Sequence, residues 1–356
     1  ASDVYKRQLF DTANWRLCAL RALGMRDFSA LTSDYFDGDD PELVDFIARQ
    51  TLPRRGILAN KDEILITMGA QNALWLSAQV LLNSRRRAAI EDHCYPALRT
   101  ILTQSRCQLS CVPVDGLGLL PSDLPPDTDV VFTTPSHQCP TTATMPLARR
   151  TALLEKAEAE DFVIVEDDYE FEMSFLNAPS PSLKSLDKNG RVIYVGSFSK
   201  SLFPGLRLGY LVGPAPFIRE ARALRATVLR HPPGHIQRTV AYYLSLGHYD
   251  ALVRRMSKAY HERRQVMDEA LNEHGLMIAG QGTYGGSSVW LRAPDGTDTT
   301  QLAERLKVDK VLIEPGAPFF SGDAPPTEYL RLAYSSIPSS RIPDGIRLIA
   351  NAIRSS

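Results

Sequence analysis

Lys200, the serines Ser197 and Ser199, and Arg207 stand close together in one short segment, Ser197 to Gly209. The apolar stretch before it, Arg191 to Val195, is typical of a buried β-strand, so Lys200 falls on the loop at the carboxyl end of that strand, where ligands of α/β proteins usually bind. A lysine amine there can form a Schiff base with an aldehyde, while serine hydroxyls and the Arg207 guanidinium can bind a phosphate dianion. The segment therefore predicts a site for pyridoxal phosphate, although a solvated lysine in a serine-rich loop would look similar.

A second apolar stretch, Phe162 to Val165, ends in an acidic cluster that contains Asp167 and Tyr169. A carboxylate at a strand end is suited to pair with the protonated ring nitrogen of pyridoxal phosphate, because a cationic ring is the electron sink of that chemistry. Three further acidic residues adjoin Asp167. The residues alone leave the choice open, with Asp168 as the main rival and an exposed acidic loop as the plainer interpretation.

A third candidate is the turn Gly69-Ala70-Gln71, which lies between a predicted strand at 63–67 and an apolar helix at 72–82. The first N–H groups of a helix have no partner within the helix, and its dipole favours an anion. The backbone amides of Ala70 and Gln71 are therefore predicted to bind the phosphate, although a tight turn that starts a core helix would give the same pattern. The side chains expected to join them are those of Ser197, Ser199 and Arg207.

The elements that position these residues appear in the sequence as short apolar runs separated by segments long enough for a helix. Such alternation indicates βαβ units and a mostly parallel sheet. Amphipathic patterns predict helices at about 145–159 and 249–273. The predicted strands are Glu63 to Thr67, Ala88 to Glu91, Val130 to Thr133, Phe162 to Val165, Val192 to Val195 and Leu208 to Val212.

The chain divides into a large and a small part in this interpretation. Residues 36–250 form the large cofactor-binding domain. Shorter strand signals at 287–292 and 329–334, with helices at about 298–306 and 342–353, predict a small α+β domain over 251–356. The segment 1–35 is expected to pack with the small domain, and its first eight residues look like a foreign or truncated start.

Composition narrows the class of protein. The 356 residues are 44% hydrophobic with a formal net charge of −1, as in a soluble globular protein with room for two domains. The near-neutral charge argues against DNA binding by this chain alone, and no apolar run is long enough to span a membrane. Five cysteines without a C-x-x-C pair favour the reducing cytoplasm, and no set of residues has the spacing of metal ligands.

Six motifs are spread along nearly the whole chain from about Trp15 onward. They are Thr67 to Gln71, Thr134 to Gln138 with Pro140, Glu166 to Tyr169, Ser197 to Gly209, Gly285 to Ser288 and Tyr329 to Tyr334. In this order they resemble the fold-type I pyridoxal phosphate enzymes, the class I and II aminotransferases, and most of all the aminotransferase-like domain of MocR-type regulators. The resemblance implies an α/β fold, with a large domain whose mostly parallel sheet is flanked by helices and a smaller α+β domain.

The resemblance also implies roles for particular residues. Lys200 holds the cofactor and, once released, is the base that moves the substrate's Cα proton. The family register selects Asp167 rather than Asp168 for the ring nitrogen. Tyr169 would donate a hydrogen bond to the phenolic oxygen of the cofactor, and Tyr95 would stack on its ring.

Substrate and partner contacts follow from the same resemblance. Arg331 would bind the α-carboxylate of an amino acid, and Tyr35 would reach the phosphate of the neighbouring subunit in a homodimer, although the segment after Tyr35 departs from the family pattern. True aminotransferases often have an asparagine before the proline that corresponds to Pro140, whereas this chain has Cys139. The hydrogen bond that this asparagine would make to the cofactor is therefore either absent or made instead by His137 or its neighbour Gln138.

The resemblance favours a cytoplasmic, homodimeric aminotransferase that moves an amino group from an amino acid to a 2-oxo acid. Two alternatives use the same residues. One is the effector-sensing domain of a MocR-type transcription regulator without its DNA-binding domain, and the other is a related lyase, decarboxylase or racemase. The sequence does not identify the amino donor or the acceptor.

Overall fold

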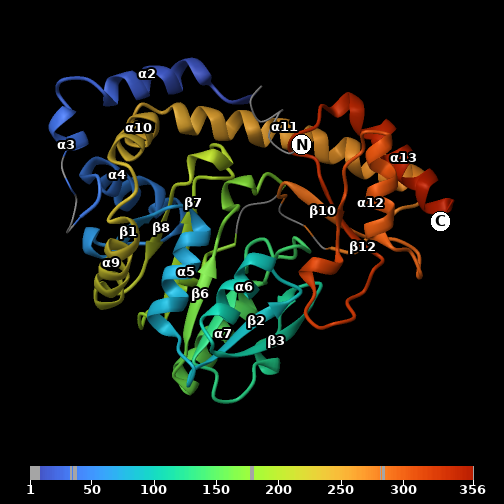
Figure 1. The fold of residues 1–356 in the computed structure, drawn as a ribbon, viewed down its shortest axis with the longest axis horizontal. Helices are drawn as coiled ribbons and strands as arrows, with labels where there is room; N and C mark the ends of the chain where they lie inside the picture. The colour runs from blue at the N-terminus through green and yellow to red at the C-terminus, as the bar shows by residue number, and fades with distance from the viewer. Residues whose placement is uncertain are drawn as a thin grey trace.

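A sheet of eight strands forms the centre of the larger part of the molecule (Figure 1). The computed structural model describes residues 9–32, 34, 38–176, 180–280, 282 and 285–355. The strands are β1 (Ile64–Thr67), β2 (Arg87–Asp92), β3 (Gln108–Asp115), β4 (Gly118–Leu119), β5 (Val130–Thr133), β6 (Val163–Asp167), β7 (Val192–Ser197) and β8 (Gly209–Val212). Their order is β1-β8-β7-β6-β5-β2-β3-β4, and the run from β7 to β3 is parallel, while β8 is antiparallel to both of its neighbours.

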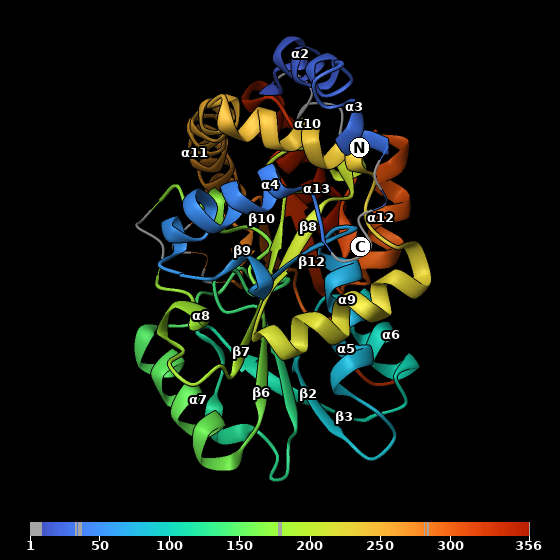
Figure 2. The same ribbon diagram turned by 90° about the vertical axis from the view of Figure 1, so that its left-hand side faces the viewer.

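Helices cover both faces of this sheet (Figure 2). Successive side chains of a strand point to opposite faces of the sheet, so neighbouring residues of β6 pack against different helices. Val165 packs in one buried cluster with Leu74, whereas Ile164 packs in another with Leu153. The predicted layered α/β arrangement is thereby confirmed. The helices are α5 (Ala70–Leu81), α6 (Pro96–Gln104) and α9 (Ala215–Leu229) on one face, and α7 (Leu147–Glu160) and α8 (Leu183–Leu186) on the other.

A second, antiparallel sheet of four strands forms the smaller part of the molecule. Its strands are β9 (Met277–Ile278), β10 (Ser288–Arg292), β11 (Glu314–Pro315) and β12 (Tyr329–Ala333), in the order β11-β12-β10-β9. The long helix α11 (His248–His274) runs from the large part toward this sheet and packs on α13 (Ile342–Arg354), which also contacts α12 (Thr299–Val308) (Figure 1). The exact domain boundaries at 35 and 250 stay predictions.

The described part of the N-terminal segment lies elsewhere than expected. Helix α2 (Thr12–Ala22) packs on α10 (Gly234–Ser245), not on the four-stranded sheet (Figures 1 and 2). Trp15 lies 5.1 Å from Phe203 and 5.5 Å from Tyr243, measured between ring centroids, and Asp27 pairs with Arg238 of α10 at 2.7 Å. These long-range aromatic and charged contacts have no local signal in the sequence.

Two strands extend further than the apolar patterns predicted. β6 includes Asp167 and β7 includes Ser197, so both residues end strands rather than stand on the following loops. The described residues contain no helix that is both long enough and apolar enough to span a membrane. The remaining helical segments are α3 (Phe28–Thr32), α4 (Pro41–Phe46) and the short turns Ile47–Thr51, Pro53–Arg55, Lys61–Glu63, Pro121–Asp123, Phe171–Met173, Pro204–Leu206, Ala317–Phe319 and Ser339–Arg341.

Candidate functional site

Lys200 stands in the tight turn that follows β7. The backbone N–H of Phe198 donates to the Leu208 carbonyl at 3.1 Å, and that of Leu202 donates to the Phe198 carbonyl at 2.8 Å, so both ends of the turn are fixed. The Lys200 side chain is 37% exposed, and its Nζ lies 4.0 Å from a carboxylate oxygen of Glu170. The amine is also 5.9 Å from the centroid of the Tyr169 ring. Lys200 is therefore accessible to a small molecule and held among the other predicted residues.

Asp167, the last residue of β6, is a buried carboxylate without a countercharge in contact. Its Oδ1 has no hydrogen-bond partner among the described residues. Burial raises the pKa of Asp167 to about 7, and the negative charges of Asp168, Glu91 and Glu166 act in the same direction. A buried charge without a partner is unfavourable, so this position would be stabilised by a cationic group such as a protonated ring nitrogen.

Asp168, the rival of Asp167, already has a cationic partner. Its Oδ2 accepts hydrogen bonds from Arg55 Nε at 2.7 Å and from the Tyr194 hydroxyl at 2.9 Å. Burial alone would raise the pKa of Asp168, but the Arg55 guanidinium and these hydrogen bonds hold it below its usual value. No partner for its buried Oδ1 is found among the described residues, yet Arg55 supplies the countercharge. This geometry favours Asp167 for the ring nitrogen.

The residues predicted to bind phosphate meet at the start of α5. Gly69 precedes this helix with a φ of 79°, and no side chain caps the helix. A Cβ atom at Gly69 would lie 3.4 Å from the Arg207 guanidinium and 3.7 Å from the Ser199 hydroxyl, which places both side chains beside the helix N-terminus. Ser199 Oγ is buried without a hydrogen-bond partner among the described residues, and Gln71 and Arg207 line one groove. Together with Ser197, whose hydroxyl accepts from the Ser199 N–H at 3.2 Å, they form a cup suited to a phosphate.

Tyr95 and Asp167 line the same small hollow. Tyr95 directly precedes α6, after the carboxyl end of β2, and is 36% exposed. This is a position from which its ring can contact a planar group beside Asp167. Stacking on the cofactor stays a prediction.

His137 and Gln138 differ in how they are engaged. Gln138 Nε2 donates to the His93 carbonyl at 2.7 Å and to the Cys139 carbonyl at 2.9 Å, and its Oε1 accepts from the Thr141 hydroxyl at 2.6 Å. His137 is 2% exposed, and neither of its ring nitrogens has a hydrogen-bond partner among the described residues. Of the two replacements for the missing asparagine, the geometry favours His137.

Arg331 lies on β12, opposite Trp290 and Glu314 on the neighbouring strands. Its Nε donates to Glu314 Oε2 at 2.7 Å, and its guanidinium carbon lies 5.3 Å from the centroid of the Phe319 ring. The positive charge of Arg331 is thus paired with Glu314 through Nε. No hydrogen bond from the two terminal nitrogens is found within the described part of the chain, so they are available to an acid group.

Cys139 connects these positions. Burial raises the pKa of its thiol to about 12, and the charges of Arg331, Lys200 and Asp167 also act on that pKa. Cys139 is therefore near residues of β6, of β12 and of the turn after β7. The polar residues at the carboxyl ends of β6 and β7 and the arginine of β12 face a common site.

Sequence reasoning did not single out four residues near this site. Glu91 on β2 accepts hydrogen bonds from the Thr133 and Thr134 hydroxyls, both at 2.6 Å, and an acid at the end of an apolar strand was a usable signal for it. Glu170 adjoins the predicted Tyr169, so its position in the acidic run was a weaker signal. Nothing in the sequence indicated Arg55 or Glu314, because each is placed near the site only by its contact with a residue distant in the chain, Asp168 and Arg331 respectively.

Tyr35 lies outside the described residues, so its contact with a neighbouring subunit and the homodimer that it implies stay predictions.

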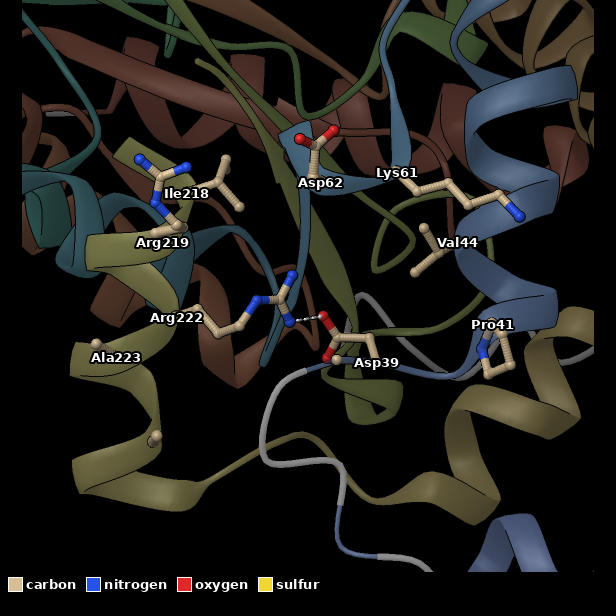
Figure 3. Close-up of a pocket in the computed structure, with 11 residues that line it drawn as sticks. Asp39, Pro41, Val44, Lys61, Asp62, Ile218, Arg219, Arg222 and Ala223 are labelled. Atoms are coloured by element: carbon tan, nitrogen blue, oxygen red, sulfur yellow. Dashed lines mark hydrogen bonds and ion pairs between the residues drawn. The ribbon is translucent and has the colours of Figure 1, made fainter. Parts of the chain in front are cut away.

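A separate hollow lies between α4 and α9 (Figure 3), and Gly38 is one of the residues that line it. Asp39 there accepts from Arg222 Nη1 at 2.9 Å and from Arg225 Nη1 at 2.6 Å. None of the residues assigned to the cofactor site is among those that line this hollow.

Comparisons with known proteins identify the family to which the chain is similar. The profile of the family "Aminotransferase class I and II" matches residues 24–348. The HTH-type transcriptional regulator TauR of Rhodobacter capsulatus is 60% identical over 98% of this chain and 72% of the regulator. A solved archaeal alanine:glyoxylate aminotransferase has a TM-score of 0.91 and 25% identity over 100% of this chain and 90% of its own. LysN, an alpha-aminoadipate aminotransferase from Thermus thermophilus complexed with N-(5'-phosphopyridoxyl)-L-leucine, has a TM-score of 0.87 and 27% identity over 98% of this chain and 90% of its own.

Proposed function

Because the chain belongs to the family of class I and II aminotransferases, whose cofactor is pyridoxal phosphate, we propose that it binds this cofactor at Lys200 and recognises a primary amine that carries an acid group. The bound cofactor would supply an aldehyde for exchange with the ligand amine and a ring that withdraws electrons. The observation that supports its placement is the buried, unpaired Asp167 Oδ1. A cationic ring nitrogen is the group that this carboxylate lacks.

The residues of the chain have distinct tasks in this proposal. Lys200 is the attachment point and, once released, the group that takes up the Cα proton of the ligand. Asp167 holds a proton on the ring nitrogen, and Arg331 binds the acid group of the ligand. Tyr169 and His137 orient the cofactor through its polar groups, and Tyr95 through its ring face. The phosphate is held by Gly69, Ala70, Gln71, Ser197, Ser199 and Arg207.

The domain acts as a ligand sensor of a transcription regulator rather than as a metabolic enzyme in this proposal. The supporting observation is the 60% identity to the regulator TauR, which extends over 98% of this chain. A sensor requires that the ligand amine replace Lys200 reversibly, without the transfer of its amino group. Cys139, at a position where true aminotransferases often have an asparagine, is consistent with weakened chemistry after that exchange.

The second candidate is an aminotransferase that passes the amino group to a 2-oxo acid. The environment of Asp167 favours it, because a carboxylate at the ring nitrogen serves proton removal from the ligand and is not needed for amine exchange alone. The fold of the solved alanine:glyoxylate aminotransferase, at a TM-score of 0.91, is compatible with either candidate.

A half-reaction screen separates the two candidates. The cofactor-loaded protein is mixed with a panel of amino acids and of amines without an acid group, and the cofactor is then extracted and identified by chromatography. A sensor should change its absorbance reversibly and return the cofactor in its aldehyde form. An aminotransferase should return the amine form of the cofactor together with a 2-oxo acid, at a rate near the 1–10³ s⁻¹ that is typical of enzymes. A protein whose absorbance responds to none of these amines would contradict both candidates.

Arg331→Ala should weaken the binding of amino acids much more than the binding of amines without an acid group. The loss of one partner of a charged pair of this kind is worth about 2 kcal/mol or more, which corresponds to roughly a 30-fold rise in the dissociation constant. Absorbance titrations with matched ligands, such as alanine and ethylamine, measure the two effects. Arg292→Ala on the adjacent strand β10 is the control, since Arg292 pairs with Asp295 at 2.8 Å. Equal losses for both ligands would remove Arg331 from the site.

A further inference from the structure

Glu170 is a buried carboxylate beside the predicted attachment point of the cofactor. It is 2% exposed, and its Oε1 lies 4.0 Å from Lys200 Nζ. The Ser287 hydroxyl donates a hydrogen bond to the same oxygen from the segment that leads into β10. The carboxylate is therefore held from the small part of the molecule, at the place where the amine of Lys200 must be replaced.

The second oxygen of Glu170 lies next to the backbone of Gly286. A Cβ atom at Gly286 would lie 3.5 Å from Glu170 Oε2 and 3.5 Å from the His137 ring. Gly286 has a φ of 96°, a left-handed conformation that L side chains rarely adopt, so its backbone favours a glycine. Glu170 and His137 therefore both lie close to the Gly286 backbone.

We propose that Glu170 is a catalytic residue that binds the ammonium group of the incoming ligand and accepts its proton. This inference rests on the proposed function, in which a ligand amine replaces Lys200. An amine must be unprotonated to attack an aldehyde carbon, whereas primary amines near neutral pH are almost wholly ammonium ions. One proton would pass from the ligand ammonium to a Glu170 oxygen. As the ligand nitrogen forms its bond to the aldehyde carbon and the bond from Lys200 Nζ breaks, the two remaining N–H protons would pass to Lys200 Nζ. The proton held by Glu170 would follow, so that Lys200 leaves as an ammonium ion. The exchange therefore begins and ends with one ammonium ion beside one carboxylate.

Electrostatics gives the physical reason for this role. A buried carboxylate is strongly destabilised without a cation in its vicinity. Attachment of the cofactor to Lys200 removes the ammonium charge of one of the two cations near Glu170, and the other, Arg331, is hydrogen-bonded to Glu314. An ammonium ligand would restore the lost positive charge within reach of the reacting carbon. The ligand class selected by Glu170 and Arg331 together is an ammonium ion that also carries an acid group.

Within the described part of the chain, six ionisable groups from several elements interact electrostatically with Glu170. Two are cations, one is an imidazole and three are phenols. These groups are Lys200 after β7, Arg331 on β12, His137 after β5, Tyr169 after β6, Tyr260 on α11 and Tyr334 after β12. Among them, burial lowers the pKa of His137 below its usual value, which makes its imidazole a weaker proton acceptor. None of these six groups is a carboxylate, so Glu170 is the carboxylate beside Lys200 that can receive a proton from an ammonium ion.

The test uses Glu170→Gln and two small amines that need no recognition of a particular ligand. Methylamine is almost wholly ammonium at neutral pH, whereas hydroxylamine is largely unprotonated. Both displace Lys200 from a bound pyridoxal phosphate, and stopped-flow absorbance gives the second-order rate constant of each reaction. The variant should slow methylamine by about 10²-fold, the lower end of what a positioned proton acceptor contributes, and should leave hydroxylamine within a factor of about two.

The pH dependence of the same reaction gives a readout that a merely structural role would not change. In Glu170→Gln the rate with methylamine should rise about tenfold per pH unit, since only the unprotonated amine reacts, whereas the wild-type rate should rise less steeply. The equilibrium dissociation constant of methylamine, taken from the same titrations, should also increase in the variant. Equal slowing of both amines, or parallel pH profiles, would overturn the proposal.

Two further variants keep the result interpretable. Glu172→Gln changes another acid of the same loop, one whose Oε1 accepts from the Tyr249 hydroxyl at 2.6 Å, and should react with both amines as the wild type does. Ser287→Ala removes the hydrogen bond that holds Glu170 and should slow methylamine selectively but less than Glu170→Gln does. Borohydride reduction and mass measurement confirm that each variant carries the cofactor. A wild-type protein without attached cofactor would contradict the proposed function, whereas a loaded variant without selectivity would contradict the role of Glu170 alone.

Discussion

Lys200→Ala should lose covalent attachment of pyridoxal phosphate completely. The Lys200 side chain is partly exposed and lies in the turn after β7, the same turn as Ser199, which we propose binds the phosphate, so it is the amine that we propose for the aldehyde. Borohydride reduction of the wild-type protein, followed by peptide mass mapping, should place the pyridoxyl group on Lys200. The same treatment of the variant should give no modified peptide.

Lys61→Ala is the control for this experiment. Lys61 lines the hollow between α4 and α9 and pairs with Asp45 at 2.7 Å, so its loss should leave cofactor attachment unchanged (Figure 3). Lys200→Ala should still bind pyridoxal phosphate without a covalent bond, because the phosphate contacts remain. A pyridoxyl group on another lysine in the wild type would show that the site is not at β7.

The strand-end positions in the large sheet were predictable because they depend on local patterns. Buried parallel strands appear as short apolar runs, and their carboxyl ends meet at one edge of the sheet, so polar residues that follow two such runs come together. Asp167 and Lys200 follow this rule. β3 was not predicted, because it lies near the edge of the sheet and its residues alternate irregularly between exposed and buried positions.

Other features of the site depend on contacts between distant residues and could not be predicted. The family register selected Asp167 over Asp168, but the physical basis of that choice is the pairing of Asp168 with Arg55, more than 100 residues away in the chain, and nothing in the local sequence of Arg55 indicates that it is buried. The role of Glu170 depends on its distance from Lys200 and on Ser287 from the small part of the molecule. A sequence pattern shows which face of an element is buried but not which side chain it meets across the molecule.

Asp167→Asn should keep the cofactor attached and yet slow the removal of the ligand's Cα proton by at least about 10²-fold, the scale on which the loss of one stabilising group in a site reduces a rate. Attachment needs only Lys200 and the phosphate contacts. Proton removal also needs a positive charge on the ring nitrogen, which an amide at position 167 cannot stabilise. The measurement is the exchange of the Cα hydrogen of an amino acid ligand for deuterium, followed by nuclear magnetic resonance. This exchange is detectable in a sensor as well as in an enzyme.

The same substitution should change the pH dependence of stability in the cofactor-free protein. The pKa of Asp167 is raised from 3.8 to about 7 by burial, so between these values the folded protein holds a proton that the unfolded chain has lost. The free energy of unfolding therefore falls as pH rises through this window, by at most about 1.4 kcal/mol per pH unit, and stays low above it. Asp167→Asn lacks this slope, so the variant should be more stable than the wild type at pH 8 and should lose that advantage near pH 4. Urea unfolding at both pH values measures the difference.

Asp168→Asn tests whether Asp168 stabilises the fold rather than binds the cofactor. Removal of its charge leaves the Arg55 guanidinium buried without its counterion, and the loss of one partner of a buried ion pair costs about 3–5 kcal/mol of stability. This variant should therefore be destabilised at pH 8, where Asp167→Asn is stabilised, and any folded fraction should exchange the Cα hydrogen of the ligand normally. The opposite pair of results, with exchange lost in Asp168→Asn and kept in Asp167→Asn, would assign the ring nitrogen to Asp168. The two substitutions thus have opposite expected effects on stability at pH 8. Asp167 lacks a countercharge until the cofactor is bound, whereas Asp168 is paired with Arg55 in the folded chain.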